Sequence, residues 1–329
     1  MKVLVTGGAG FIGSTTCSAL IDAGHTPVIL DSFVTGRREY VKGRIFYEGD
    51  IADSGLMAKI LKENPDIEAC IHFAARIVVE ESVAEPLLYY EENVSKSIAL
   101  FANLRDAGIK KVIFSSSAAV YGTAEVAVTE STPLTPTSPY ARTKMMMEMA
   151  LEDFANAGYF KGIALRYFNL IGADPKMRTG PFLPDPSHIL GRLVDTAMGK
   201  TPQFTIFGDD WDTRDGTTVR DYIHVWDLAL AHVAALEHFD RVAAEQYNVI
   251  NLSTGEGTTV KEFVDAFINV WGEIPIVIGA RRKGDIVGAY AKSERSAKLL
   301  GWKTQFSIEQ GIKDALHWVE SVRDSVLQL

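Results

Sequence analysis

Short apolar runs alternate with longer amphipathic segments along the first half of the chain. Such runs are typical of the strands of a parallel sheet, and they occur at residues 3–5, 27–30, 44–48, 68–75, 111–115 and 163–167. Apolar residues at helical spacing predict helices between several of them, at residues 14–23, 89–107 and 140–157. This order predicts an α/β fold with a doubly wound parallel sheet.

The composition of the sequence changes after Asn169, where a loop rich in Gly, Pro and Asp extends to Pro186. Beyond this loop we predict a helix at residues 187–198, a strand at 203–207 and a polar loop at 208–218. A further helix and strand, at residues 226–238 and 247–251, continue the pattern of the first half. We therefore expect one domain of residues 1–169, extended by about 226–252, and a smaller discontinuous α/β lobe of residues 170–225 and 253–329.

Three glycines join the first strand directly to the first helix. Gly7 allows a tight turn, Gly10 lets the backbone approach a pyrophosphate, and Gly13 lets the helix pack closely on the strand. The phosphates would then meet the positive end of the helix dipole. The spacing is GxxGxxG rather than GxGxxG, and a tight turn without a ligand is the alternative. We predict a dinucleotide-binding domain of the Rossmann type.

Two aspartates stand at the ends of the next strands. Asp31 ends the second strand, where a carboxylate accepts hydrogen bonds from ribose hydroxyls and repels a 2′-phosphate. This favours NAD over NADP, although Arg37 and Arg38 follow closely. Asp50 could accept a hydrogen bond from the adenine amino group or cap a helix beginning near Ser54, and both interpretations stay open.

The candidate chemistry lies after the fifth strand. That strand ends in a serine run containing Ser117, and the later segment SPYARTK places Tyr140 and Lys144 four residues apart, on one helical face. A phenol is a poor base at neutral pH, but a lysine ammonium and an oxidised nicotinamide beside it both favour the phenolate. The Ser117 hydroxyl can polarise the reacting oxygen. These residues predict proton transfer coupled to hydride transfer.

Composition narrows the classes of partner. The net charge is −9 and no cluster of basic residues occurs, which argues against a nucleic-acid partner. No apolar run reaches the length of a membrane span, and no spacing of His, Cys and carboxylates predicts a metal site. Cys17 and Cys70 lie in apolar segments and suggest no disulfide framework, so we expect a cytoplasmic protein.

Several motifs together carry a resemblance to a known family. TGGAGFIG, HFAA, SSSAAVYG, SPYARTK and RYFN in the first half, with GTTVRDYIHVWDLA and RRKGD in the second, resemble the extended short-chain dehydrogenase/reductase superfamily and, within it, the UDP-glucose 4-epimerases. The resemblance covers nearly the whole chain. It implies an isomerase with tightly bound NAD that interconverts UDP-glucose and UDP-galactose. It also implies a homodimer, built from the helix ending at Ala107 and the helix starting at Tyr140.

The resemblance also assigns roles to single positions. The catalytic residues are Ser117, Tyr140 and Lys144. The cofactor positions are Gly7, Gly10, Phe11, Ile12, Gly13, Asp31, Ser32, Asp50, Ile51, Phe73, Ala74, Ala75, Ser115, Tyr140, Lys144 and Tyr167. The substrate positions are Ser117, Tyr140, Asn169, His188, Arg220, Tyr222, Arg282, Asp285 and Ala289. One departure is Ile77, where these epimerases usually carry a lysine that contacts the cofactor.

Four of these substrate positions have alternatives when they are read without the family. Arg220 and Arg282 can clamp a diphosphate, but a single arginine is more often a surface ion-pair partner. His188 could equally be a surface histidine. Ala289 implies a small residue beside the sugar C2 substituent, which would admit N-acetylated sugars; it could instead pack the end of a strand, and Tyr290 is one residue away.

Three other functions stay under consideration. A nucleotide-sugar 4,6-dehydratase needs an acid and a base just after the serine run, where this chain has Ala118 and Ala119. A UDP-glucuronate epimerase or decarboxylase is harder to exclude by chemistry. A non-catalytic NAD-sensing regulator could share the fold, but such proteins tend to lose the Tyr/Lys pair, which this chain retains.

Overall fold

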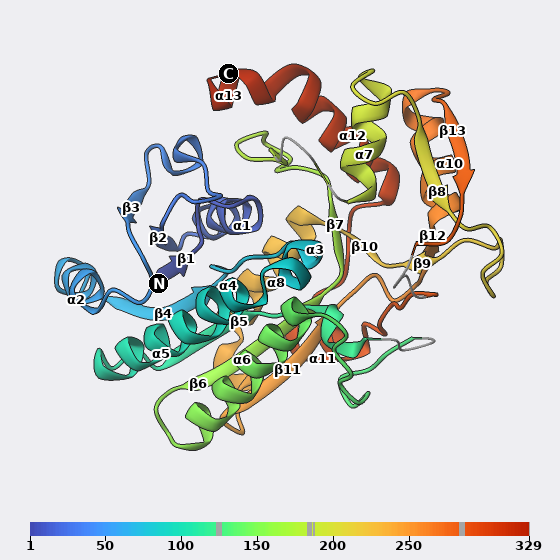
Figure 1. Ribbon diagram of the computed structural model, residues 1–329. Coiled ribbons are helices and arrows are strands. Elements are labelled where there is room, and N and C mark those ends of the chain that lie inside the picture. Colours follow the sequence, from blue (N-terminus) through green and yellow to red (C-terminus); the bar gives the residue numbers. More distant parts are fainter. Residues whose placement is uncertain (123–126, 183–185, 187, 283–286, 329) are drawn as a thin grey trace.

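The computed structural model describes residues 1–122, 127–182, 186, 188–282 and 287–328. Its centre is a seven-stranded sheet in which all strands are parallel, in the order β11-β6-β5-β4-β1-β2-β3 (Figure 1). The strands are β1 (Lys2–Thr6), β2 (Thr26–Asp31), β3 (Ile45–Glu48), β4 (Ile67–His72), β5 (Lys111–Ser115), β6 (Lys161–Tyr167) and β11 (Tyr247–Leu252). The predicted Rossmann-type parallel sheet is therefore confirmed.

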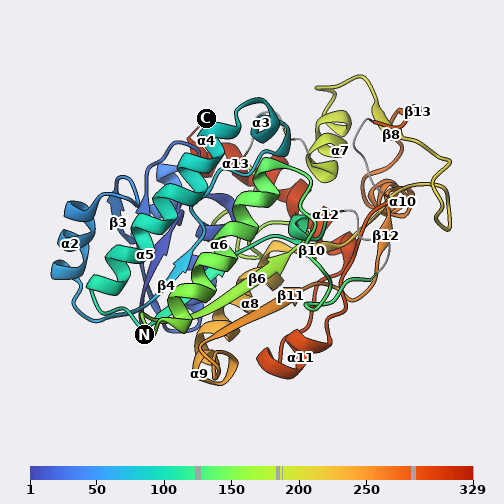
Figure 2. The ribbon, with the colours of Figure 1, turned by 60° about the horizontal axis from the view of Figure 1, so that its bottom comes forward.

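Helices cover both faces of this sheet (Figure 2). One face carries α1 (Phe11–Asp22) and α8 (Val225–Glu237), and the other carries α2 (Ser54–Glu63), α5 (Lys96–Asp106) and α6 (Pro139–Asn156). Val3 and Val5 of β1 pack on the first face and Leu4 on the second, because successive side chains of a strand point to opposite sides. All three are fully buried, which explains why the strands read as continuous apolar runs.

The helix predicted at residues 89–107 is divided in the structure. It consists of α4 (Pro86–Tyr90), a π-helical turn (Glu91–Ser95) and α5, and it is preceded by α3 (Val79–Ala84). Shorter turns occur at Arg38–Val41 and Ala118–Tyr121, and α9 (Phe239–Val242) follows α8. Among the residues described, no helix combines the length and the apolar character that crossing a membrane requires.

The strand order reverses at β1, which lies between β2 and β4. The chain therefore leaves β1 and β4 in opposite directions around the sheet, and this is the point at which doubly wound sheets bind ligands. The glycine loop follows β1 and the residues Phe73–Ala75 follow β4. The topology thus brings the predicted cofactor positions to one edge of the sheet.

A second core forms beside this edge. It contains α7 (Ile189–Ala197), α10 (Val260–Trp271) and α12 (Ile308–His317), and the described chain ends with a π-helical turn (Trp318–Val322) and α13 (Arg323–Leu327). Three two-stranded sheets accompany it: β7 (Asn169–Ile171) with β10 (Tyr222–His224), β8 (Phe204–Phe207) with β13 (Ile276–Gly279), and β9 (Val219–Arg220) with β12 (Thr258–Thr259). Figure 1 shows these elements gathered on one side of the large sheet.

Two details differ from the sequence-based expectation. The loop expected after Asn169 begins with β7, which is too short to show a strand pattern in the sequence. In addition, α11 (Glu294–Leu300) lies against α8, α9 and β11 (Figure 2), and Leu300 and Trp302 are buried in the first core. This part of residues 253–329 thus packs on the first domain, while the predicted division of the chain otherwise stays a prediction.

Candidate active site

The three glycines after β1 form a cradle with distinct local constraints. Gly7 has a φ of +72°, and a Cβ there would lie 2.6 Å from the backbone nitrogen of Ala74. A Cβ on Gly13 would lie 2.2 Å from the Gly7 carbonyl oxygen, so the helix could not pack so closely on the turn. A Cβ on Gly10 would meet nothing nearer than 3.4 Å. Packing therefore requires Gly7 and Gly13, whereas Gly10 presents open backbone.

Helix α1 begins within this cradle. Its first turn contains no acidic residue, and Gly10 offers no side chain to cap the helix. The first N–H groups of a helix lack partners within the helix and carry partial positive charge. Phe11 and Ile12, the first two residues of α1, are half-buried at this point. The cradle therefore fits a pyrophosphate.

Asp31 closes the cradle from the end of β2. Its Oδ2 accepts a hydrogen bond from the Ala9 nitrogen at 2.9 Å, and its Oδ1 accepts one from the Phe33 nitrogen at 2.8 Å. Burial raises the pKa of Asp31, and these two backbone bonds oppose the rise. The two arginines that could have favoured a 2′-phosphate have other partners: Arg38 pairs with Glu48 at 2.5 Å, and Arg37 stacks on Phe182.

Asp50 does not cap the helix that follows it. The cap of α2 is Asp53, whose Oδ1 accepts a hydrogen bond from the Leu56 nitrogen at 2.9 Å, so the capping interpretation of Asp50 was wrong. Asp50 instead accepts hydrogen bonds from the Ala52 nitrogen at 2.9 Å and from Lys96 Nζ at 2.6 Å. The contact with adenine stays a prediction.

The remaining cofactor positions border the same edge. Ile51 is buried, Ser32 is exposed after β2, and Phe73, Ala74 and Ala75 are half-buried after β4. At the usual lysine position, Ile77 is 56% exposed. The preceding Arg76 is directed to Glu81, with 3.4 Å between Nη1 and Oε1.

Helix α6 delivers Tyr140 and Lys144 to the end of β5. The Ser138 hydroxyl caps this helix by accepting a hydrogen bond from the Ala141 nitrogen at 3.2 Å, and Pro139 occupies its first position. Tyr140 therefore lies in the first turn. Lys144, one turn later, is buried and donates to the Ser115 carbonyl oxygen at 2.8 Å.

The hydroxyl groups of the site meet at the same point. The Ser117 hydroxyl lies beside the phenol of Tyr140 and favours its ionised form, and the Ser117 Oγ accepts a hydrogen bond from the Ala119 nitrogen at 3.2 Å. The Ser115 hydroxyl hydrogen-bonds the phenol of Tyr167. The structure thus brings together the three predicted catalytic residues, although they come from two separate segments of the chain.

The pKa of Tyr140 differs from the expectation. Burial raises the pKa of Tyr140, and the hydrogen bond from Ser117 opposes this rise without cancelling it. The predicted lowering of this pKa by Lys144 is therefore not seen. Burial also lowers the pKa of Lys144 to about 8, so its ammonium group prevails at neutral pH.

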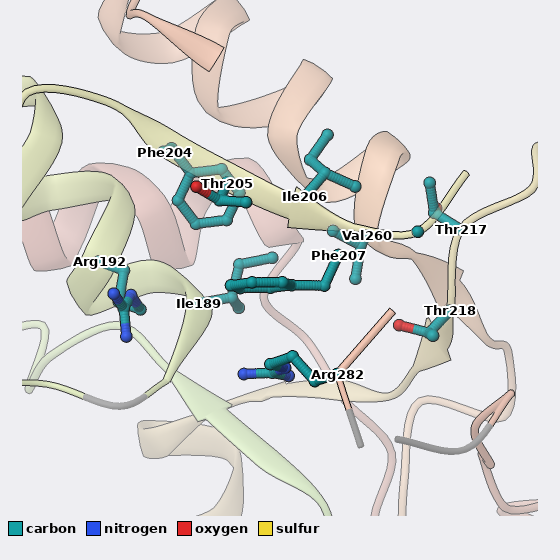
Figure 3. A pocket seen from close by; sticks show the side chains of 11 residues that line it. Ile189, Arg192, Phe204, Thr205, Ile206, Phe207, Thr217, Thr218, Val260 and Arg282 are labelled. Carbon is teal, nitrogen blue, oxygen red and sulfur yellow. The ribbon is translucent and has the colours of Figure 1, made fainter. Parts of the chain in front are cut away.

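A cavity of about 90 Å³ lies in the second lobe. Figure 3 shows the Phe207 ring edge-on, with the Arg282 side chain below it and Ile189 beside it. The Arg282 guanidinium is 4.6 Å from the centre of the Phe207 ring. The other residues that line the cavity are Arg192, Phe204, Thr205, Ile206, Gly208, Thr217, Thr218 and Val260. An apolar slot with a cationic wall fits a planar heterocycle that carries phosphates.

The structure places the other predicted substrate residues around this lobe. Asn169 is exposed at the start of β7, and Arg220 donates through Nη1 to the carbonyl oxygens of Val219 and Val287, at 2.7 and 3.4 Å. His188 caps α7, because its Nδ1 accepts a hydrogen bond from the Gly191 nitrogen at 3.1 Å. Asp285 lies outside the described residues.

Tyr222 has a different environment from the other substrate positions. It is 4% exposed, and its ring packs on Phe263 with 4.3 Å between ring centres. The structure therefore gives Tyr222 a place in the second core, and its contact with substrate stays a prediction.

Ala289 lies beside the catalytic turn. It packs on a cluster of buried side chains that includes Val120 and Tyr121, which follow Ser117 in the chain. The ring of the next residue, Tyr290, contacts the opposite side at Gly257, where an added Cβ would lie 2.7 Å from that ring. Of the two positions, Ala289 is therefore the one that packs on the cluster containing Val120 and Tyr121.

Sequence reasoning missed two parts of the site. Phe207 and Ile189 line the cavity, and the only signal for them was that Phe207 precedes the predicted polar loop. Asn93 is 2% exposed and holds the chain after β4, because its side chain exchanges hydrogen bonds of 2.8 and 3.0 Å with the Arg76 backbone. It also donates to Thr143 on α6, at 3.2 Å. A polar residue within a predicted helix gave no sign of this role.

Comparison with known proteins agrees with this geometry. The model of the NAD dependent epimerase/dehydratase family matches residues 3–249. The chain belongs to this family. A UDP-glucose 4-epimerase of Azospirillum brasilense is 42% identical to this family member and is aligned over 99% of the chain and 94% of the relative. The resemblance seen in the sequence motifs is therefore confirmed.

Two solved structures of epimerases are also similar. A UDP-glucose-4-epimerase from Stenotrophomonas maltophila, with bound NAD and formylated UDP-arabinopyranose, has a TM-score of 0.94 and 38% identity and covers 99% of both chains. A UDP-Glc/GlcNAc 4-epimerase from Campylobacter jejuni has a TM-score of 0.84 and 35% identity, and covers 96% of this chain and 98% of that one.

Proposed function

We propose that this chain is an isomerase that carries out the 4-epimerisation of UDP-hexoses, with UDP-glucose and UDP-galactose as the interconverted pair. The observation that carries the proposal is the meeting of Ser117, Tyr140 and Lys144 beside the glycine cradle. A hydroxyl, a phenol and an ammonium at the mouth of a dinucleotide site suit reversible oxidation of a sugar alcohol. The reaction consumes no second substrate, because the sugar is oxidised and then reduced at the same carbon.

NAD is the cofactor of this reaction. The residues fit it: the cradle would hold the pyrophosphate, Asp31 would accept hydrogen bonds from the ribose hydroxyls, and its negative charge would disfavour a 2′-phosphate. When bound, oxidised NAD supplies a hydride acceptor and a positive charge near the reacting carbon.

The protein residues then have separate tasks. Tyr140 accepts the proton of the sugar 4-hydroxyl and returns it after the 4-keto sugar has turned in the pocket. Ser117 donates a hydrogen bond that steadies the phenolate and the reacting oxygen. Lys144 holds its ammonium at the end of β5, where it donates to the Ser115 carbonyl oxygen. Arg220 and Arg282 are proposed to hold the diphosphate, and the slot beside Phe207 the uracil, while the sugar turns.

The test uses the purified protein without added coenzyme. Incubation with UDP-galactose, followed by separation of the sugar nucleotides, is expected to yield UDP-glucose until the two reach equilibrium. Appearance of a 4-keto-6-deoxy sugar would identify a dehydratase. Turnover of UDP-glucuronate alone would identify a UDP-glucuronate epimerase or decarboxylase. Absence of any reaction with NAD bound would favour a regulator.

The dehydratase alternative has little support in the geometry. Elimination of water needs an extra acid and base near the sugar. Ala118 and Ala119 begin the turn after Ser117, and their methyl groups cannot transfer protons. We therefore favour epimerisation.

Asp31→Ala tests the cofactor assignment. The change removes a ribose acceptor and the charge that repels a 2′-phosphate, so we expect weaker NAD binding and a smaller preference for NAD over NADP. Loss of a hydrogen bond from a charged group costs about 1.5–3 kcal/mol, or roughly 10- to 150-fold in the NAD dissociation constant. Cofactor titration of the stripped protein measures both quantities. An unchanged preference would place the ribose elsewhere.

The substrate range is proposed to include the N-acetylated pair, UDP-N-acetylglucosamine and UDP-N-acetylgalactosamine. The small side chain of Ala289 beside the catalytic turn supports this, since an acetamido group needs room. The similarity to the Campylobacter jejuni UDP-Glc/GlcNAc 4-epimerase supports it as well.

A homodimer through α5 and α6 is proposed from exposed apolar side chains on these helices. Ile98 of α5 is 41% exposed, and Met146 and Met149 of α6 are 38% and 57% exposed. Light scattering is expected to give twice the chain mass of 36.1 kDa, and Met149→Glu is expected to shift the mass toward the monomer because it buries a charge at the interface. A wild-type monomer at micromolar concentration would contradict the proposal.

The proposed compartment is the cytoplasm. Cys17 and Cys70 are both buried free thiols. A reducing compartment maintains cysteines in this state.

A further inference from the structure

A buried ion pair lies directly behind the catalytic residues. Glu148 is on α6, one helical turn after Lys144, and Arg166 is on β6, immediately before Tyr167. Arg166 Nε donates to both carboxylate oxygens of Glu148, at 2.9 and 3.1 Å, and Nη2 donates to Oε2 at 2.5 Å. Only 4% of the Glu148 side chain and 5% of the Arg166 side chain is exposed. Burying two charges costs free energy even when they are paired, so stability alone is a weak reason for such a pair.

The pair is connected to both ends of the turn that carries Ser117. The hydroxyl of Ser116 donates to Glu148 Oε1. At the other end, Arg166 Nη1 donates to the Tyr121 phenol at 2.8 Å. The turn between Ser116 and Tyr121 is therefore attached to the helix that carries Tyr140 and Lys144.

Continuation of this network reaches the edge of the sheet. The Tyr121 hydroxyl donates to Asn251 Oδ1 at 2.7 Å, and Asn251 is fully buried on β11. The backbone nitrogen of Asn251 donates to Glu130 Oε1 at 2.8 Å. The ion pair thus lies at the centre of a connection from α6 through β6 to β11.

We propose that Glu148, with Arg166, is a positioning residue of the active site, which fixes the Ser117 turn against α6 so that Ser117 stays in hydrogen-bonding contact with Tyr140. This inference rests on the proposed function, because it assigns a role within the same reaction. Glu148 also acts on Lys144 through its charge: burial lowers the pKa of Lys144, and the carboxylate opposes that shift. Of the other titratable groups nearby, Tyr121 and Tyr247 face the Glu148–Arg166 pair. Glu152 acts on Tyr247, and His72 faces Lys144.

The first test is Glu148→Gln, which keeps the size of the side chain but removes its charge. We expect kcat for UDP-galactose to fall by about 10- to 100-fold, with KM changed less than twofold, because the reacting groups lose their alignment. The alkaline limb of the plot of kcat against pH is expected to move to lower pH, since Lys144 loses its proton more readily without the carboxylate. Unchanged kcat and an unchanged limb would overturn the proposal.

A second variant separates positioning from stability. Glu148→Met combined with Arg166→Met replaces the pair by apolar side chains of similar length, which is often neutral or stabilising. We expect the melting temperature to recover relative to Glu148→Gln while kcat stays low. Recovery of kcat together with the melting temperature would show that the pair is merely structural. The matched control is Asp174→Asn, which removes the charge of a buried carboxylate that pairs with the partly exposed Arg178, and it is expected to lower the melting temperature without moving the pH profile.

A measurement without substrate keeps the inference separate from the proposed function. The absorbance of the Tyr140 phenolate is obtained by subtracting the titration of Tyr140→Phe. Removing a negative charge by Glu148→Gln would by itself lower the Tyr140 pKa, whereas loss of the Ser117 hydrogen bond raises it. We expect a rise. A fall or no shift would overturn the positioning role, even if the wild type proved to have another activity.

Discussion

Tyr140→Phe is expected to lower kcat for UDP-galactose by about 10²- to 10⁴-fold, because it removes the group that exchanges the proton with the sugar 4-hydroxyl. The ring remains, so the packing at the start of α6 is retained, while the phenol loses its interaction with Ser117. Substrate binding is expected to change little, since the proposed diphosphate and uracil contacts lie around the cavity of the second lobe. Steady-state kinetics with a separate titration of UDP measures both parts.

The matched control is Tyr47→Phe, which also removes one phenolic hydroxyl. That hydroxyl donates to Glu63 at 2.6 Å on the exposed side of α2, outside the site. The control is expected to keep wild-type kcat. Near-normal turnover by Tyr140→Phe would remove the residue from the mechanism, and equal losses in both variants would indicate an effect on folding rather than on chemistry.

The sequence predicted those features that depend on local geometry. The roles of Gly7 and Gly13 follow from a strand that turns immediately into a helix, and both glycines meet backbone atoms as the motif requires. The positions of Tyr140 and Lys144 follow from helical spacing. The parallel sheet was predictable because its strands are apolar on both faces.

Features that depend on contacts between distant segments could not be read in this way. The rise in the Tyr140 pKa comes from burial, which no spacing in the sequence reveals. The position of Tyr222 in the second core depends on Phe263, which is far away in the chain. The partnership of Glu148 and Arg166 likewise joins α6 to β6, and each residue alone looks like an ordinary surface charge in the sequence.

The sequence leaves open whether Ala289 or Tyr290 lies beside the sugar C2 substituent, and the structure gives the two side chains different environments. The backbone nitrogen of Val128 donates to the Tyr290 carbonyl oxygen at 2.8 Å, which fixes the register of the segment. In an extended segment, successive side chains point to opposite sides. Ala289 therefore packs on the cluster of Val120, Tyr121, Val128 and Ala291, while the ring of Tyr290 lies against Gly257.

Ala289→Tyr is expected to abolish most of the activity on N-acetylated sugars. The cluster on which Ala289 packs (Val120, Tyr121, Val128 and Ala291) is already fully buried, so a new ring has no room on that side, and we expect it to extend toward the sugar. There it would occupy the space of the acetamido group. We expect kcat/KM for UDP-N-acetylglucosamine to fall by about 100-fold or more, and kcat/KM for UDP-glucose by less than about fivefold.

Two further variants make this experiment decisive. Ala289→Ser keeps the side chain small and is expected to retain both activities, while Tyr290→Ala removes the neighbouring ring and is expected to leave the ratio of the two kcat/KM values unchanged. Loss of discrimination in Tyr290→Ala would place the specificity residue one position later. A wild type that ignores N-acetylated sugars, or an Ala289→Tyr variant that accepts them as well as the wild type does, would show that another residue limits the size of the sugar, because Ala289 would then leave the C2 substituent untouched.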